Sequence, residues 1–193
     1  MKNAGLKALL DKPFFTGREA KEHGIESNRL TYYVNKGVLE RVSRGVYRNP
    51  NAVNDAPFEW QDLLEEAQAI PDGTICLISA LNYYGMTVEV QRKFWIAIPH
   101  SAGALKRPNA KIIRMRNFDL GRVPLRIGPY RTFIFDQERC VIDAFRYLPR
   151  ESAVRILREY LKSSKDRKPD LPKLGKYADE LCVKITPYLE ALT

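Results

Sequence analysis

The sequence is poor in the residues that build metal centres and disulfide frameworks. Its 193 residues include two histidines, His23 and His100, and three cysteines, Cys76, Cys140 and Cys182. No pair of them has the spacing of a zinc site. The cysteines are odd in number, far apart and surrounded by apolar residues, which indicates buried, reduced thiols of a cytoplasmic protein. We therefore expect neither a metal nor a cofactor.

Long apolar runs are also missing. No stretch approaches the roughly 18 apolar residues of a membrane span, and the opening residues, MKNAGLK, lack the apolar segment of a secretory signal. Hydrophobic residues make up 45% of the chain and charged residues 28%, a composition typical of globular proteins that fold without disulfides. These features argue against a membrane-spanning or secreted protein.

Recognisable catalytic motifs are absent as well. Ser79 lacks the flanking glycines of a nucleophile elbow, and no glycine-rich phosphate loop or dinucleotide fingerprint is present. Four acidic residues close in sequence suit Mg²⁺-dependent nuclease chemistry: Asp119, Asp136, Glu138 and Asp143. Asp136 and Glu138 also flank a predicted helix start, where the helix dipole favours acids. We predict a protein that is not an enzyme, with a nuclease as the minor alternative.

The first 50 residues have the pattern of a winged helix-turn-helix. A first helix is predicted near residues 2–10. Thr16 then caps a short helix that is closed by Gly24. Ser27 caps the next helix, Asn28–Lys36, which stops at Gly37. Residues 38–48 then alternate as a two-stranded hairpin that turns near Arg44 and Gly45. This hairpin is a basic wing.

The second capped helix and the wing carry side chains suited to double-stranded DNA. Leu30 and Val34 point inward with Ile25, which leaves a polar outer face. Asn and Arg form bidentate hydrogen bonds with base edges, and Lys and Arg contact phosphates. The predicted DNA-binding residues are Ser27, Asn28, Arg29, Thr31, Tyr32, Asn35 and Lys36 in the helix and Arg41, Arg44 and Arg48 in the wing. The alternative is an ordinary solvated helix and hairpin.

Charge is distributed in blocks along the chain. The formal net charge of +9 combines +5 in residues 1–50, −5 in residues 51–100 and +7 in residues 101–150, with the remainder in the last segment. Two basic blocks indicate a polyanion footprint with two parts. The second block predicts a second basic surface formed by Lys106, Arg107, Lys111, Arg114 and Arg116. The alternatives are a solvated sheet face and a surface that binds RNA.

The rest of the chain reads as one mixed domain. Residues 51–57 form a polar, proline-bounded linker, and residues 58–193 form an α+β domain with a helical C-terminal part. Asp55 caps a helix over 56–70 that exposes Glu59, Asp62, Glu65 and Glu66. Strands are predicted at 74–77, 94–98, 111–116 and 130–135, and helices at 79–84, 138–148, 151–162 and 170–182 and from residue 186 onward. The fold class is α+β.

Four segments resemble the AbiEi family, the antitoxins of type IV abortive-infection toxin–antitoxin systems. They are LERVSRGVY at 39–47, SALNYYG at 79–85, WIAIP at 95–99 and PYLEAL at 187–192. They occur in the order found in the family and span nearly the whole chain. One departure is Tyr84, which stands where many relatives have histidine.

The resemblance implies a two-domain protein with two activities. The N-terminal domain would bind operator repeats in its own promoter and repress transcription. The second domain would counteract a nucleotidyltransferase-type toxin in phage defence, without a tight complex with that toxin. A winged-helix transcription regulator without a toxin partner is the alternative.

Overall fold

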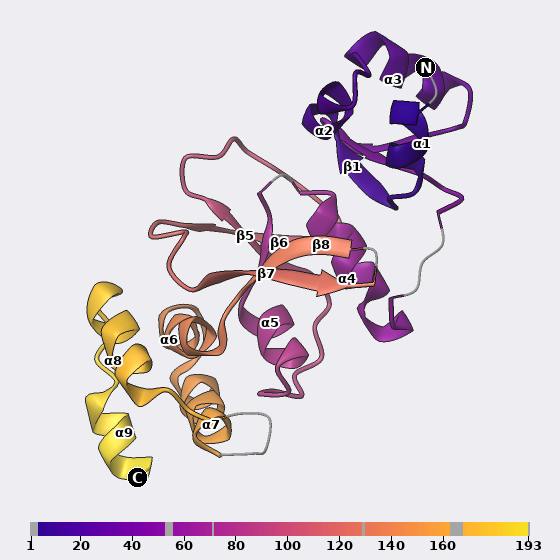
Figure 1. Cartoon of the computed structure of the whole chain (residues 1–193). Helices are drawn as coiled ribbons and strands as arrows, with labels where there is room; N and C mark the ends of the chain where they lie inside the picture. The colour runs from indigo at the N-terminus through magenta and orange to yellow at the C-terminus, as the bar shows by residue number, and fades with distance from the viewer. Residues whose placement is uncertain (1–3, 53–55, 71, 129, 163–167, 193) are drawn as a thin grey trace. The chain divides into compact units, whose positions relative to one another are not determined.

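The computed structural model describes residues 4–52, 56–70, 72–128, 130–162 and 168–192 (Figure 1). The chain is an α+β protein, as predicted. Its contacts divide it into two compact units. Unit 1 comprises residues 1–73 and 124–132, and unit 2 comprises residues 74–123 and 133–193.

Unit 1 begins with a winged helix. Its elements are α1 (Ala4–Leu10), β1 (Phe14–Thr16), α2 (Gly17–Glu22), α3 (Ser27–Asn35), β2 (Glu40–Ser43) and β3 (Val46–Arg48). The three strands are antiparallel in the order β1-β3-β2. The predicted helices and hairpin are therefore present, and β1 is an additional strand that the sequence analysis did not predict. A core of seven buried residues joins the helices to the sheet: Leu9, Phe15, Ala20, Ile25, Leu30, Leu39 and Tyr47.

The two N-caps of the helix-turn-helix differ from each other. Thr16 caps α2 as predicted, since its hydroxyl accepts from the Glu19 amide at 3.2 Å while the Glu19 carboxylate accepts from the Thr16 amide at 2.8 Å. The prediction that Ser27 caps α3 is wrong. The N-cap is Glu26, in extended conformation and without a side-chain capping bond. The helix starts at Ser27, one residue before the predicted start at Asn28. The reason is that Ile25, which is buried and whose amide donates to the Ala20 carbonyl, fixes the chain just before the helix.

Unit 1 also contains α4 (Phe58–Gln68) and the outer part of a β-hairpin, residues 124–132. Buried side chains connect them to the winged helix: Phe14, Val46, Ala56, Leu64 and Tyr130. The division into units thus places α4 with the N-terminal domain, whereas the boundary predicted from the sequence falls before it. The predicted cap, Asp55, lies outside the described residues. The prediction that Glu66 is exposed is wrong, because it is buried on the packed side of α4.

Unit 2 contains most of a five-stranded sheet and five helices of the described chain. Its strands are β4 (Thr74–Ile75), β5 (Phe94–Pro99), β6 (Ala110–Met115), β7 (Arg122–Ile127) and β8 (Tyr130–Phe135), in the order β6-β5-β4-β8-β7. The outer parts of β7 and β8 belong to unit 1. The helices are α5 (Leu77–Tyr83), α6 (Gln137–Tyr147), α7 (Arg150–Leu161), α8 (Leu171–Glu180) and α9 (Thr186–Leu192).

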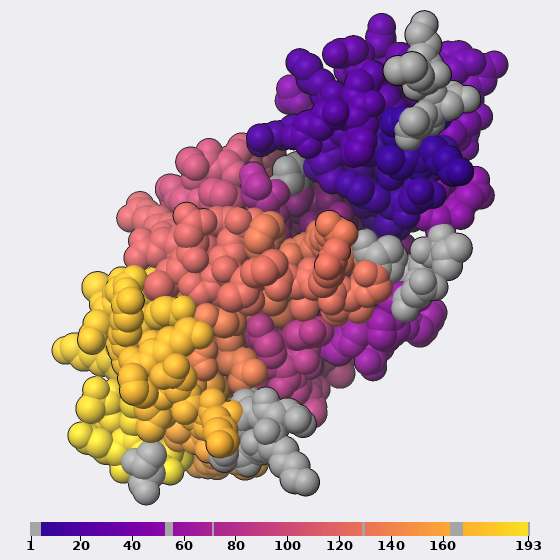
Figure 2. Space-filling view, in the orientation of Figure 1, coloured from indigo at the N-terminus to yellow at the C-terminus, as the bar shows by residue number. Residues whose placement is uncertain are grey.

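The C-terminal helices pack on one another in unit 2. The Phe145 ring of α6 and the Tyr188 ring of α9 lie 5.2 Å apart, and α8, yellow in Figure 2, packs on α6. Three predictions need correction here. β7 was not predicted as a strand, and α5 starts two residues before the predicted Ser79. Cys182 is exposed after α8, whereas Cys76 and Cys140 are buried as predicted.

Candidate nucleic-acid interface

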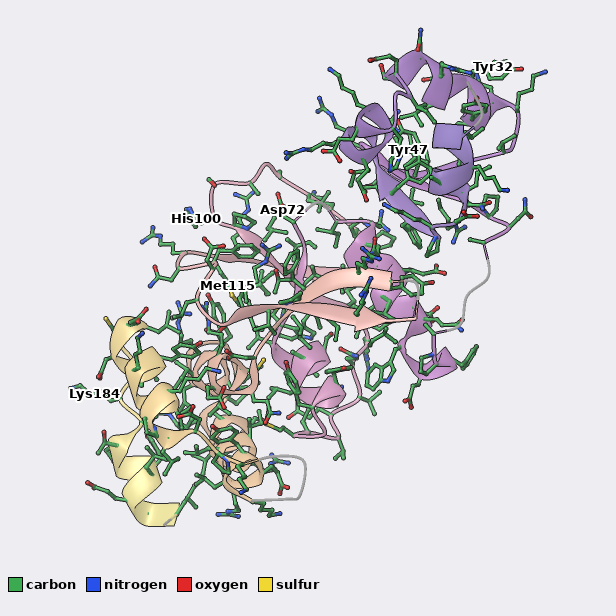
Figure 3. The ribbon with its side chains drawn as sticks, viewed as in Figure 1. Tyr32, Tyr47, Asp72, His100, Met115 and Lys184 are labelled. Carbon is green, nitrogen blue, oxygen red and sulfur yellow. The ribbon has the colours of Figure 1, made fainter. Side chains whose placement is uncertain are left out.

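The helix α3 is anchored along one face and open along the other. Ile25 and Leu30 are 3% and 1% exposed in the winged-helix core, and the partly buried Val34 packs against the same cluster. Figure 3 shows Tyr47 directed into this core and Tyr32 directed away from it. Because the apolar face is fully used by the core, the polar face is the one presented to solvent.

The outer face of α3 carries the polar residues predicted from the sequence. Its exposed members are Ser27, Asn28, Thr31, Tyr32, Asn35 and Lys36. The Thr31 hydroxyl is occupied by the helix itself, since it donates to the Ser27 carbonyl at 3.1 Å. The Lys36 ammonium lies 5.9 Å from the centre of the Tyr32 ring, and that ring is 56% exposed. Asn35 and Lys36 lie at the C-terminal end of this face, just before the wing in the sequence.

Arg29 is the one member of the predicted helix set that is partly buried. Its Nη2 donates to the Tyr33 hydroxyl at 3.3 Å, and its guanidinium carbon lies 6.0 Å from the centre of the same ring. The Arg29 amide also donates to Oδ1 of Asn28 at 2.7 Å. The Arg29 head group is therefore held by a neighbour one helical turn away.

The wing presents two exposed arginines. Arg41 and Arg44 are exposed on β2 and the following turn, and Gly45 allows this tight turn with a φ of +78°. The strand register shifts between Arg41 and Ser43, which lets Val42 pack against the second core cluster of unit 1. The predicted phosphate contacts at Arg41 and Arg44 are thus sterically accessible.

Arg48 differs from the other two wing arginines. Its guanidinium forms ion pairs with Glu40 at 2.5 Å and with Glu65 at 3.3 Å. The hydrogen bond to Glu40 raises the pKa of Arg48, and the charge of Glu65 acts in the same direction. Arg48 therefore holds two carboxylates of its own unit, and its contact with phosphate stays a prediction.

The second basic surface lies in unit 2, around the edge strand β6. Lys106, Lys111, Arg114 and Arg116 are exposed there, and Arg107 is partly buried. The Lys111 ammonium lies 3.6 Å from the centre of the Trp95 ring, so one of the five charges is held in a cation–π contact. Met115, between Arg114 and Arg116, is buried, which is the alternation expected of a sheet with one solvated face.

Three of the four acidic residues considered for magnesium are paired with other residues of the protein, and the fourth, Asp119, is exposed. Asp136 caps α6 by accepting from the Arg139 amide at 2.9 Å. Lys173 bridges Asp136 and Glu138 at 3.0 and 2.9 Å, and Asp143 pairs with Arg139 at 2.8 Å. Among the described residues no group of three His, Cys, Asp or Glu side chains is arranged to hold a metal ion.

Three basic side chains hold these acids, and none of the pairings was predicted from the sequence: Arg139, Arg146 and Lys173. Arg139 is completely buried, and besides Asp143 it donates to the carbonyls of Asn117 and Leu120, at 2.8 Å each. Burial lowers the pKa of Lys173, but its hydrogen bonds to Glu138 and Asp136 outweigh burial and raise it above 10.5. The spacing of Arg139 and Asp143, four residues apart on a helix, is the signal that could have revealed the first pair.

A comparison with known families bears on the N-terminal region. Residues 6–50 match the model of a family described as transcriptional regulator, AbiEi antitoxin. Over these residues the chain is similar to AbiEi regulators. The AbiEi match covers most of α1 and all of the helix-turn-helix and wing, and it confirms the resemblance drawn from residues 39–47. The other three resembling segments lie outside the matched residues.

The remaining comparisons add two findings. No curated protein matches the chain. None of the helices in the described part of the chain has the length and hydropathy needed to cross a bilayer. The AbiEi match supports a regulatory rather than a catalytic protein.

Proposed function

We propose that this protein is a sequence-specific DNA-binding repressor of its own operon and the antitoxin of a type IV toxin–antitoxin system. The observation that carries the proposal is the exposed polar face of α3 beside the basic wing, within the region that matches AbiEi regulators. In this proposal α3 reads bases in the major groove and the wing holds the phosphate backbone. Such a repressor works in the cytoplasm, on double-stranded operator repeats.

The division of labour follows from side-chain chemistry. Arg29 offers paired donors to a guanine edge, and Asn35 offers a donor and an acceptor to an adenine edge. Arg41 and Arg44 lie on the wing, which in this proposal contacts phosphates rather than base edges, so they supply affinity for any duplex. The basic surface around β6 in unit 2 is a second candidate surface for phosphates, with Arg114 and Arg116 exposed on it.

Substitutions test this division directly. Arg29→Ala and Asn35→Ala are each expected to weaken operator binding by about 1–3 kcal/mol and to reduce selectivity over scrambled DNA. Arg44→Ala is expected to weaken binding to both duplexes alike and to flatten the salt dependence by about one unit of slope. Equal losses on operator and scrambled DNA for the two helix variants would overturn the assignment of α3 as the reading helix.

The antitoxin half of the proposal rests on the second domain counteracting a nucleotidyltransferase-type toxin. A plain winged-helix regulator without a toxin partner is the second candidate, and it is favoured by the fact that the family match ends at residue 50. Co-expression separates the two. Rescue of cells from a neighbouring nucleotidyltransferase gene by this protein, with no stable complex on purification, supports the antitoxin, and failure to rescue supports the plain regulator.

A further inference from the structure

The hydroxyl of Tyr33 is placed differently from the other polar groups of α3. The Tyr33 ring is partly buried and packs against the winged-helix core, so its position is fixed by apolar neighbours. Its backbone carbonyl accepts from the amides of Val38 and Leu39, at 3.0 and 3.3 Å. Tyr33 is therefore held by the core at its ring and by the start of the wing at its main chain.

The hydroxyl group of Tyr33 contacts a residue of the predicted DNA-binding set. The Tyr33 hydroxyl accepts from Nη2 of Arg29 at 3.3 Å. The guanidinium also approaches the ring, at 6.0 Å from its centre, which adds a weak electrostatic attraction. An arginine side chain has four rotatable bonds, and ordering it on binding costs free energy. A contact that orders it beforehand reduces that cost.

We infer that Tyr33 is a positioning residue that holds the Arg29 guanidinium in its DNA-reading orientation before DNA binds. The inference rests on the proposed function, because it assigns a supporting residue to the reading helix. The Tyr33 hydroxyl takes one N–H of Nη2, and the second N–H of Nη2 still forms a two-donor edge with Nη1 or Nε that can meet a base edge. The effect of Tyr33 on DNA must therefore pass through Arg29.

Tyr33→Phe tests this, because it removes the hydroxyl and keeps the ring in the core. The probes are a duplex from directly upstream of the gene and a scrambled duplex of the same composition, both bound to the full chain. Tyr33→Phe is expected to weaken binding to the upstream duplex about two- to tenfold and to leave the scrambled duplex unchanged. Tyr47→Phe is the matched control, since it removes a tyrosine hydroxyl from the same core, and is expected to bind like the parent protein.

A double-mutant cycle separates positioning from a merely structural role. In an Arg29→Ala background, Tyr33→Phe is expected to have no further effect on the upstream duplex. An unchanged affinity for Tyr33→Phe alone, or a loss that persists without Arg29, would overturn the inference. Either of these two results leaves the proposed function intact as long as the parent protein prefers the upstream duplex. A parent protein that binds both duplexes equally would refute the proposed function itself.

Discussion

Replacing Arg139 by methionine is expected to destabilise unit 2 more than any surface substitution. The guanidinium is fully buried and donates to Oδ2 of Asp143 and to two main-chain carbonyls at 2.8 Å each. Methionine keeps the apolar stem but supplies none of these donors. Since Asp143 retains a second partner, Arg146 at 2.7 Å, the acid does not become an isolated buried charge.

The magnitude follows from these contacts. Breaking a buried ion pair from one side costs about 3–5 kcal/mol, and each buried carbonyl left without a donor costs about 1–3 kcal/mol. The Arg146 contact offsets part of that sum. We therefore expect the free energy of unfolding of unit 2 to fall by about 3–5 kcal/mol.

The two tryptophans allow unit 2 to be followed by itself. Trp60 lies in unit 1 and Trp95 in unit 2, so a Trp60→Phe background leaves a single fluorescent reporter on β5. Urea unfolding of Arg139→Met in this background is expected to show a clearly lower midpoint. Arg158→Met is the matched control, because Arg158 is exposed on α7 of the same unit, and its effect is expected within about 0.5 kcal/mol. Similar midpoints for the two variants would refute the reasoning.

Two further predictions concern an acid and the thiols. Burial raises the pKa of Glu19, but hydrogen bonds from Thr16 and Lys12 outweigh burial and hold that pKa below 4.5. The ionised Glu19 carboxylate therefore stabilises the folded state above pH 4.5, and this stabilisation is lost as the pH falls through the pKa of the folded state. Glu19→Gln should accordingly lower the melting temperature at pH 7 and have a progressively smaller effect as the pH drops below 4.5; a constant difference would contradict this. Native protein should react with a thiol reagent at Cys182 alone, because burial raises the pKa of Cys76 and Cys140 and shields them; fast labelling of all three would contradict the packing.

Local signals in the sequence were sufficient for much of the winged helix. The Thr16 N-cap, the turn at Gly45 and the inward Leu30 depend on residues within one turn of each other, and the structure confirms them. β1 was missed because a three-residue strand becomes recognisable only through its pairing with β3. Ser27 failed as a cap because tertiary anchoring at Ile25 fixed the chain first.

The contacts of unit 2 depend more on tertiary structure. The burial of Arg139 requires carbonyls from a loop about twenty residues earlier, which periodicity within one helix does not reveal. Cys182 looked buried by composition, but the chain leaves α8 there with a φ of +55° and exposes the side chain. On α3, the exposure of Asn28 and Tyr32 was predicted from helical spacing, whereas the contact between Arg29 and Tyr33 emerged only from the structure.

The proposed function requires that α3 and its wing read DNA. The most direct measurement is binding of the purified full chain to the duplex upstream of its own gene and to scrambled DNA, across a salt titration. We predict tighter binding to the upstream duplex, with log K falling linearly against log salt at a slope of roughly −0.9 for each phosphate contacted. Weak binding that is equal on both duplexes would contradict the claim.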